Sequence, residues 1–170
     1  MATVTISPAQ YAQYMIGLGE KFMPTMIKGI RSGGMNCIPI MQRKTMTAPP
    51  ASDNGTIGAV NYGTYKAAWK VRALSNGITI YNDIGYSGVI EFGRRPSPVG
   101  KAGIANLEKW AKRKMGLSDS ESKSAAFAIA RHLQKHPLHP RAVMTGGIDE
   151  MTEAIAKNIE HELNKVLSET

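Results

Sequence analysis

The chain has 170 residues and a formal net charge of +8, from 21 Lys and Arg against 13 Asp and Glu. This length suits one domain with a moderate core, and 42% hydrophobic with 20% charged residues is an ordinary globular composition. No apolar run approaches the roughly 18 residues that a membrane span needs, and a single cysteine excludes an internal disulfide.

The positive charge is spread along the sequence. Residues 1–50 carry a net charge of +4, and residues 51–100 and 101–170 carry +2 each. Such a diffuse charge favours contact with acidic surfaces or nucleic acid without indicating specific DNA binding. The first five residues contain no basic stretch followed by an apolar one, so we expect no secretory signal.

Helical periodicity starts near the N-terminus. Ser7 and Pro8 are typical of a helix start, with Ser as the cap and Pro in the first turn. Apolar residues then recur at helical spacing: Tyr11, Met15, Leu18, Phe22, Met26 and Ile30. Pro24 predicts a kink or a split, and Gly33-Gly34 predicts a break before a second apolar stretch over residues 35–41. We therefore expect N-terminal helices within residues 1–46.

A loop and a β-hairpin follow. Residues 47–55 are rich in proline and small polar residues, which predicts a mobile loop extending over residues 47–62. From Lys66 to Leu74 apolar and basic residues alternate, as in a half-buried strand, and Asn76-Gly77 suits a tight hairpin turn. With these two as the loop residues, Ala73 pairs with Ile80 and Arg72 with Tyr81. Five residues then share one face: Trp69, Val71, Ala73, Ile78 and Ile80.

Four further helices are expected towards the C-terminus. A short one over residues 86–93 ends at Gly93, and Arg94 to Pro98 leaves it as an extended basic segment. A second, around Trp110, ends at Gly116. A third opens with a capping box at Ser118, turns Ala126, Phe127, Ala130 and Leu133 inward, and ends before Pro137 and Pro140. The last runs from about Ile148 to Leu167, with an apolar stripe of Ile148, Met151, Ile155, Ile159, Leu163 and Val166.

Motifs for catalysis or cofactor binding are not found in the sequence. Cys37 lies in an apolar helical stretch, where a buried inert thiol is the common case. His132 and His136 are four residues apart and close to His139, but the Glu of a zincin motif and a set of cysteine partners are missing. No phosphate-binding glycine loop is present. We expect no catalytic residues, no metal site and no cofactor, and hence no enzyme.

The densest basic cluster has two interpretations. Residues 112–114, Lys-Arg-Lys, lie beside Trp110 and would be able to hold a nucleic-acid backbone. Trp110 belongs to the apolar stripe of its helix, however, and the cations lie on the opposite side, as on any solvated helix face. The solvated face is the favoured interpretation.

From about residue 63 onward, the chain carries an ordered set of residues that resembles a known family. The set comprises Gly63-x-Tyr65-Lys66-x-x-Trp69, Asn76-Gly77, Ile80-Tyr81-Asn82, Tyr86-x-x-x-Ile90-Glu91-x-Gly93-Arg94-Arg95-Pro96, Leu107-x-x-Trp110-x-x-x-Lys114-x-Gly116, Ala130-Arg131 and Pro140-Arg141-x-x-Met144. Its order and spacing are similar to those of tailed-phage neck and tail-completion proteins of the lambda minor tail protein Z type. The resemblance covers about two thirds of the chain.

The resemblance implies a structural virion protein. It implies one α+β domain over residues 1–170, in which a small antiparallel hairpin packs against a long N-terminal helix and several C-terminal helices. The expected assembly is a homo-oligomeric ring, six- or twelve-fold, in the neck at the head–tail junction of the virion, built in the host cytoplasm. Its partners would be further copies of the chain, portal, connector or stopper proteins, and the tail terminator or tail tube. Phage DNA would pass through the lumen without sequence-specific binding, and no membrane would be involved.

Four residues are carried over as interface candidates: Glu91, Arg94, Arg95 and Arg141. The arginines present planar groups with several donors, which suit the carboxylates of a neighbouring subunit. Alternatively, one arginine pairs with Glu91 in its own subunit. Residues 47–60 and the terminal helix are further candidates for reaching the next subunit.

Other functions remain open. A tail terminator capping the tail tube belongs to the same class of assembly, and it differs by its place in the virion. A basic nucleic-acid-binding module is suggested by the charge alone. An enzyme with a metal site at the histidine cluster would require bound zinc and loss of activity on replacing His132.

Overall fold

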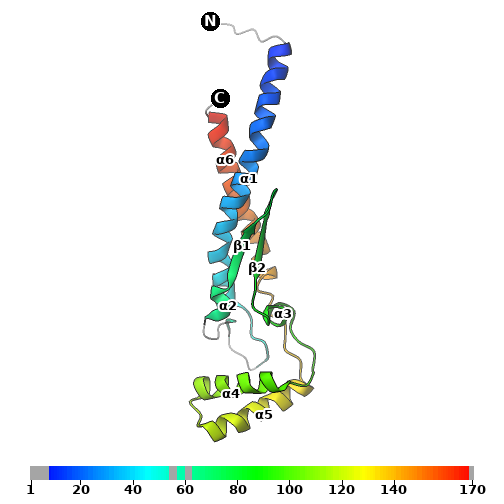
Figure 1. Ribbon diagram of the computed structural model, residues 1–170, viewed down its shortest axis with the longest axis vertical. Helices are drawn as coiled ribbons and strands as arrows, with labels where there is room; N and C mark the ends of the chain where they lie inside the picture. The colour runs from blue at the N-terminus through cyan, green and yellow to red at the C-terminus, as the bar shows by residue number, and fades with distance from the viewer. Residues whose placement is uncertain (1–7, 54–56, 60–62, 169–170) are drawn as a thin grey trace. The chain divides into compact units, whose positions relative to one another are not determined.

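The computed structural model describes residues 8–53, 57–59 and 63–168. It is 68% helical with one two-stranded antiparallel sheet (Figure 1), so the expected α+β class is confirmed. The elements are α1 (Pro8–Thr47), α2 (Thr64–Ala67), β1 (Trp69–Ala73), β2 (Ile78–Asn82), α3 (Ser87–Phe92), α4 (Lys101–Met115), α5 (Asp119–Lys135), a 3-10 turn (Thr145–Gly147) and α6 (Ile148–Ser168).

The elements form two compact units. Unit 1 contains the described residues of α1 up to Met46, residues 63–84 and residues from Met144 onward. Unit 2 contains residues 47–53, 57–59 and 85–143. The single domain expected over residues 1–170 stays a prediction. Part of the expected mobile loop, at residues 54–56 and 60–62, lies outside the described residues.

Helix α1 runs without a break for 40 residues, with Pro24 and Pro39 inside it. The expected split at Pro24 and the break at Gly33-Gly34 are therefore wrong. Both prolines are exposed, so the carbonyl that each leaves without its helical hydrogen bond faces solvent. The Thr25 hydroxyl also donates to the Lys21 carbonyl at 2.7 Å, next to Pro24. Packing of the flanking turns keeps the helix continuous where local propensity would end it.

The glycines of α1 permit close packing. A Cβ on Gly29 would lie 2.6 Å from the Ile159 Cα, and one on Gly33 would lie 2.8 Å from the Ile155 Cα. Both distances are too short for any side chain, so α6 contacts the α1 backbone directly. A Cβ on Gly34 would collide with the Ile78 side chain of the hairpin. The glycine pair that resembles a helix break is the place where α6 and the hairpin meet α1 (Figure 1).

The hairpin forms with a register shifted by two residues. Ala73 pairs with Ile78 and Val71 with Ile80, so Ser75 and Asn76 make the turn and the Leu74 amide donates to the Gly77 carbonyl. The expected pairing of Ala73 with Ile80 and Arg72 with Tyr81 is wrong. Because side chains alternate with a period of two, the shift leaves the same residues on the apolar face. The expected face is thus confirmed.

The strand also begins later than its alternation indicates. Residues 64–67 form the short helix α2, and its Tyr65 is buried with its ring edge-on to Trp69, with the centroids 5.6 Å apart. The Trp69 indole N–H donates to the buried Thr45 hydroxyl of α1 at 3.0 Å. The alternation of apolar and polar residues over 66–68 therefore belongs to a short helical turn, and this turn places the Trp69 side chain in the core.

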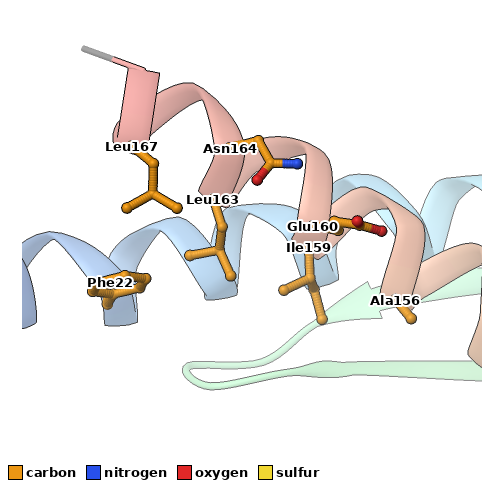
Figure 2. A pocket seen from close by; sticks show the side chains of 7 residues that line it. All are labelled: Phe22, Ala156, Ile159, Glu160, Leu163, Asn164 and Leu167. Carbon is orange, nitrogen blue, oxygen red and sulfur yellow. The ribbon is translucent and has the colours of Figure 1, made fainter. Parts of the chain in front are cut away.

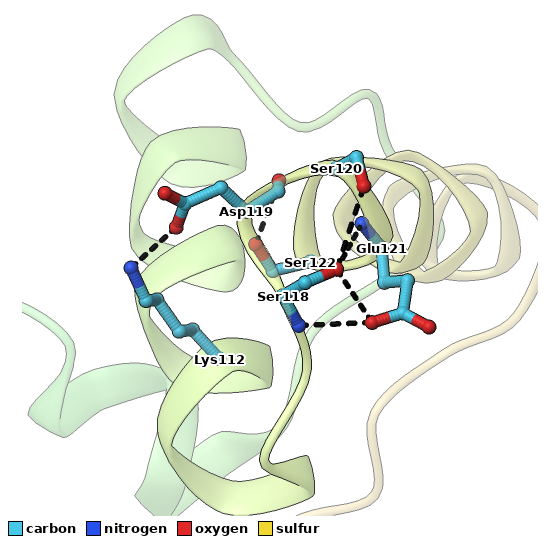
Figure 3. Close-up of polar contacts among 6 residues, drawn as sticks. All are labelled: Lys112, Ser118, Asp119, Ser120, Glu121 and Ser122. Carbon is cyan, nitrogen blue, oxygen red and sulfur yellow. Dashed lines mark hydrogen bonds and ion pairs between the residues drawn. The ribbon is translucent and has the colours of Figure 1, made fainter.

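In unit 2, α4 and α5 form a helical hairpin. Gly116 ends α4 in the left-handed region at φ 66°, and Ser118 begins α5 with the expected capping box. Figure 3 shows the Glu121 carboxylate accepting from the Ser118 amide at 2.9 Å, and the Lys112 ammonium paired with Asp119. Ala126 and Ala130 are buried as expected, but Phe127 is 52% exposed. Its inward orientation was predicted wrongly because it lies about 100° around the helix from Ala126.

Candidate subunit interface

Two segments that the resemblance singled out lie side by side in unit 2. The backbones of Arg94 and Leu138 exchange two hydrogen bonds of 2.9 Å. The Arg141 amide donates to the Ile90 carbonyl at 2.8 Å, and the next amide donates to the Glu91 carbonyl at 3.2 Å. Gly93 makes this possible: its φ is 74°, and a Cβ there would collide with the Leu138 carbonyl.

The Arg94 side chain bonds to its own segment. One guanidinium nitrogen donates to the Ser97 carbonyl at 2.9 Å, to the Ser97 hydroxyl at 2.6 Å and to the Pro98 carbonyl at 3.1 Å. These bonds fold the extended basic segment back on itself. The observed role of Arg94 is therefore local, and its expected contact with a neighbouring subunit stays a prediction.

The other three candidates differ in exposure. Arg141 is half-buried, donates to the Gly58 carbonyl at 2.6 Å, and its burial lowers its pKa. Glu91 is half-buried on the last turn of α3. Arg95 is exposed and makes no hydrogen bond or ion pair with any described residue. Of the four, Arg95 presents its charge most openly to a partner, and the interface role of all four stays a prediction.

A second candidate surface, which sequence reasoning missed, comes from the lengths of α1 and α6. The two helices pack antiparallel, with Gly33 against Ile155 and Gly29 against Ile159. Continuing this register places Ser168, the last residue of α6, opposite about residue 20 of α1. The first three turns of α1 extend past α6 and past the hairpin (Figure 1).

The apolar stripe of α1 continues into these uncovered turns. In these turns Met15 is 47% exposed and Ile16 64%, and Met23, in the part of α1 that runs alongside α6, is 59% exposed. Measured around the helix axis from Gly33, which α6 contacts, all three lie within about 100°. Gly19 lies among them, and a Cβ there would meet nothing within 4 Å. We name Met15, Ile16, Gly19, Met23 and Met26 the distal stripe. Large apolar side chains gathered in this way on one face mark an interaction surface.

An apolar groove adjoins the distal stripe. It has a volume of about 360 Å³, opens between α1 and the last turns of α6, and is lined by Phe22, Ala156, Ile159, Glu160, Leu163, Asn164 and Leu167. Figure 2 shows Leu163 and Leu167 pointing from α6 towards Phe22 on α1. Asn164 and Glu160 bring polar groups to the groove, as at the rim of many interfaces.

Ion pairs fix the part of α1 next to this groove. Glu162 of α6 is buried and pairs with Lys28 at 2.7 Å and with Lys165 at 3.0 Å. Hydrogen bonds from these two ammonium groups lower the pKa of Glu162 to about 2. The carboxylate therefore stays ionised at neutral pH and links the two helices one turn from the groove.

The residues tested for chemistry are placed as follows. Cys37 is fully buried, and its burial raises the pKa of the thiol, as expected for a packing role. The rings of His132 and His136 stack with centroids 4.1 Å apart, and no group of three or more potential metal ligands occurs in the part of the chain that the structure describes. Among the described residues, no helix is long and apolar enough to cross a membrane.

The sequence pattern predicts only part of the distal stripe. Helical spacing predicts a stripe that includes Met15, Phe22 and Met26 but not Ile16 and Met23, and the glycine pair predicts that the helix ends near Gly33. Only a 40-residue helix beside a 21-residue partner leaves part of that stripe without cover.

Comparison with protein-family models, curated proteins and solved structures gives no match to this chain.

Proposed function

We propose that the chain is a structural virion protein of a tailed phage that forms a homo-oligomeric ring in the neck, at the head–tail junction. The observation that carries this proposal is the distal stripe with its adjoining groove. An uncovered apolar surface on a rigid pair of helices is suited to holding protein against protein. The ordered residues that resemble the lambda minor tail protein Z type support the phage setting.

Two surfaces of different shape support the proposal of a ring. Ring closure requires a head-to-tail contact, in which each subunit offers two complementary surfaces. The distal stripe is a convex helix face, whereas the groove at Phe22, Leu163 and Leu167 is concave. In the proposed ring, the stripe of one copy lies in or beside the groove of the next.

The test is copy number and contact in assembled particles. Virions lacking the protein are complemented with the wild-type chain, cross-linked, and analysed for ladders of this chain. The proposal expects several copies per particle, cross-linked through α1. A single copy per particle, or normal infectious virions without the protein, would refute it.

A matched pair of variants tests the surface. Met23 and Met35 lie on the same helix and are 59% and 60% exposed, but they are about 120° apart around its axis. We expect Met23→Lys to reduce incorporation into particles at least tenfold, because it buries a charge at the contact. Met35→Lys, which lies outside the distal stripe, leaves incorporation within twofold of the wild type. Equal effects of both variants would remove the distal stripe from the interface.

A further inference from the structure

The positive charge of the chain is concentrated in unit 2. Unit 2 contains eleven Lys and Arg against five Asp and Glu, a net charge of +6, whereas the rest of the chain carries only +2. No acidic residue occurs between Ser122 and Ile148. Most of α5 and the segment after it is therefore acid-free, and the charge belongs to one unit.

The basic residues of the two units differ in their ion pairs with carboxylates. In unit 1, Lys28, Arg43, Lys44, Lys70, Lys157 and Lys165 all form ion pairs with carboxylates. In unit 2, both acids of α5 are engaged at its first turn, Asp119 by Lys112 and Glu121 by Ser118 (Figure 3). After Glu121, α5 carries no further carboxylate. Asp119 lies four residues before Lys123 on the same side of the helix, but its carboxylate is paired with Lys112.

Four of these downstream residues form one stripe. Lys123, Phe127, Arg131 and Lys135 follow each other at intervals of four residues, which places them on one side of α5, and all four are exposed. Their row lies to one side of the buried Ser122 and Ala126, with Phe127 about 100° around the helix from Ala126. Lys123 helps to lower the pKa of Asp119, but the three cations make no hydrogen bond or ion pair with any described residue. We name this set the α5 basic face.

We propose that the α5 basic face binds the phosphate backbone of duplex DNA, independently of sequence. Arg131 and Lys135 are like charges four residues apart, which destabilises an isolated helix, so an external anion beside them is the partner that makes this arrangement favourable. Lys123 and Lys135 are about 18 Å apart along the axis, roughly the rise of five base pairs. Phe127 gives the centre of the face an apolar contact suited to the sugar edges between phosphates. In the proposed ring, which the inference takes as its setting, this face would contact the passing genome.

The test measures binding of a fluorescein-labelled 30-base-pair duplex by the free full-length chain, by anisotropy over a salt series. Lys123→Gln/Arg131→Gln/Lys135→Gln is compared with Lys21→Gln/Arg72→Gln/Lys157→Gln, which removes the same charge from unit 1. We expect the α5 variant to raise Kd at least tenfold and to reduce the slope of log K against log salt by about 2.7, the value for three phosphate contacts. The unit 1 variant changes Kd less than threefold.

Several outcomes would overturn the inference. Equal effects of the two triple variants would indicate a diffuse field, and no binding by the wild type at 50 mM salt would exclude DNA. Binding of polyglutamate in place of DNA would identify an acidic protein partner. The variant Lys123→Arg/Arg131→Lys/Lys135→Arg keeps the charges and should retain binding. It controls for loss of binding by misfolding. Because Met23→Lys is expected to bind DNA normally, failure of the ring and failure of DNA binding are distinguishable.

Discussion

At the scale of single residues, the same amino acid has opposite roles along α1. Gly33 lies where α6 contacts the helix backbone, and a Cβ would be 2.8 Å from the Ile155 Cα. Gly17 lies on the uncovered part, where a Cβ would meet nothing within 4 Å. A glycine inside a helix is costly unless close approach requires it, so the two positions differ in what they contribute.

This difference predicts opposite signs for one substitution. Gly33→Ala should lower the free energy of unfolding by roughly 1–3 kcal/mol, because the backbones must separate. Gly17→Ala should raise it by roughly 0.5–1 kcal/mol, because alanine loses less backbone entropy on folding. Urea unfolding followed by circular dichroism measures both. A neutral or stabilising Gly33→Ala would contradict the close contact between α1 and α6.

At the scale of elements, the antiparallel pair of α1 and α6 depends on pH through Glu162. Its pKa in the folded chain is about 2, below the ~4.3 of an unfolded glutamate. A lowered pKa stabilises the fold above the unfolded value, and this stabilisation is lost as the pH falls from about 4.5 to about 2. We expect Glu162→Gln to flatten the pH dependence of the thermal midpoint in that window.

The matched control is Glu160→Gln, two residues earlier on α6. Glu160 is exposed and forms no ion pair with the described residues. Its variant should therefore keep the wild-type profile below pH 4.5. If Glu162→Gln and the wild type lose stability in parallel, the pairing with Lys28 and Lys165 does not link the helices.

Sequence patterns predict the features that depend on neighbouring residues, and they miss those that depend on packing against distant parts of the chain. The capping box at Ser118 and the helix end at Gly116 depend only on residues close by in the sequence, and both are confirmed. The continuity of α1 depends on α6, more than a hundred residues away, so Gly33-Gly34 was mistaken for a break. The hairpin face was predicted because alternation fixes it, whereas the register depends on which two residues make the turn.

The two candidate surfaces are likewise visible in part in the sequence and depend in part on the fold. The distal stripe is apolar in the sequence, but its exposure depends on where α6 ends. The α5 basic face has a regular spacing in the sequence, but the net charge of residues 101–170 obscures it, because that span adds the acidic residues of α6 to the basic residues of α4 and α5. Neither surface follows from composition alone.

At the scale of the whole molecule, we expect that the first turns of α1 can be removed without unfolding the rest of the chain. The described side chains of this segment include the exposed Met15 and Ile16, and α6 ends opposite about residue 20. We expect a chain lacking residues 1–16 to keep its thermal midpoint within about 3 °C at low protein concentration, since little packed surface is lost. The same chain should fail to incorporate into particles, because it lacks Met15 and Ile16 of the distal stripe. Circular dichroism at 222 nm measures the first result and cross-linking measures the second. A midpoint lowered by 10 °C or more would show that these turns belong to the core of the subunit, and their apolar side chains would then need no partner.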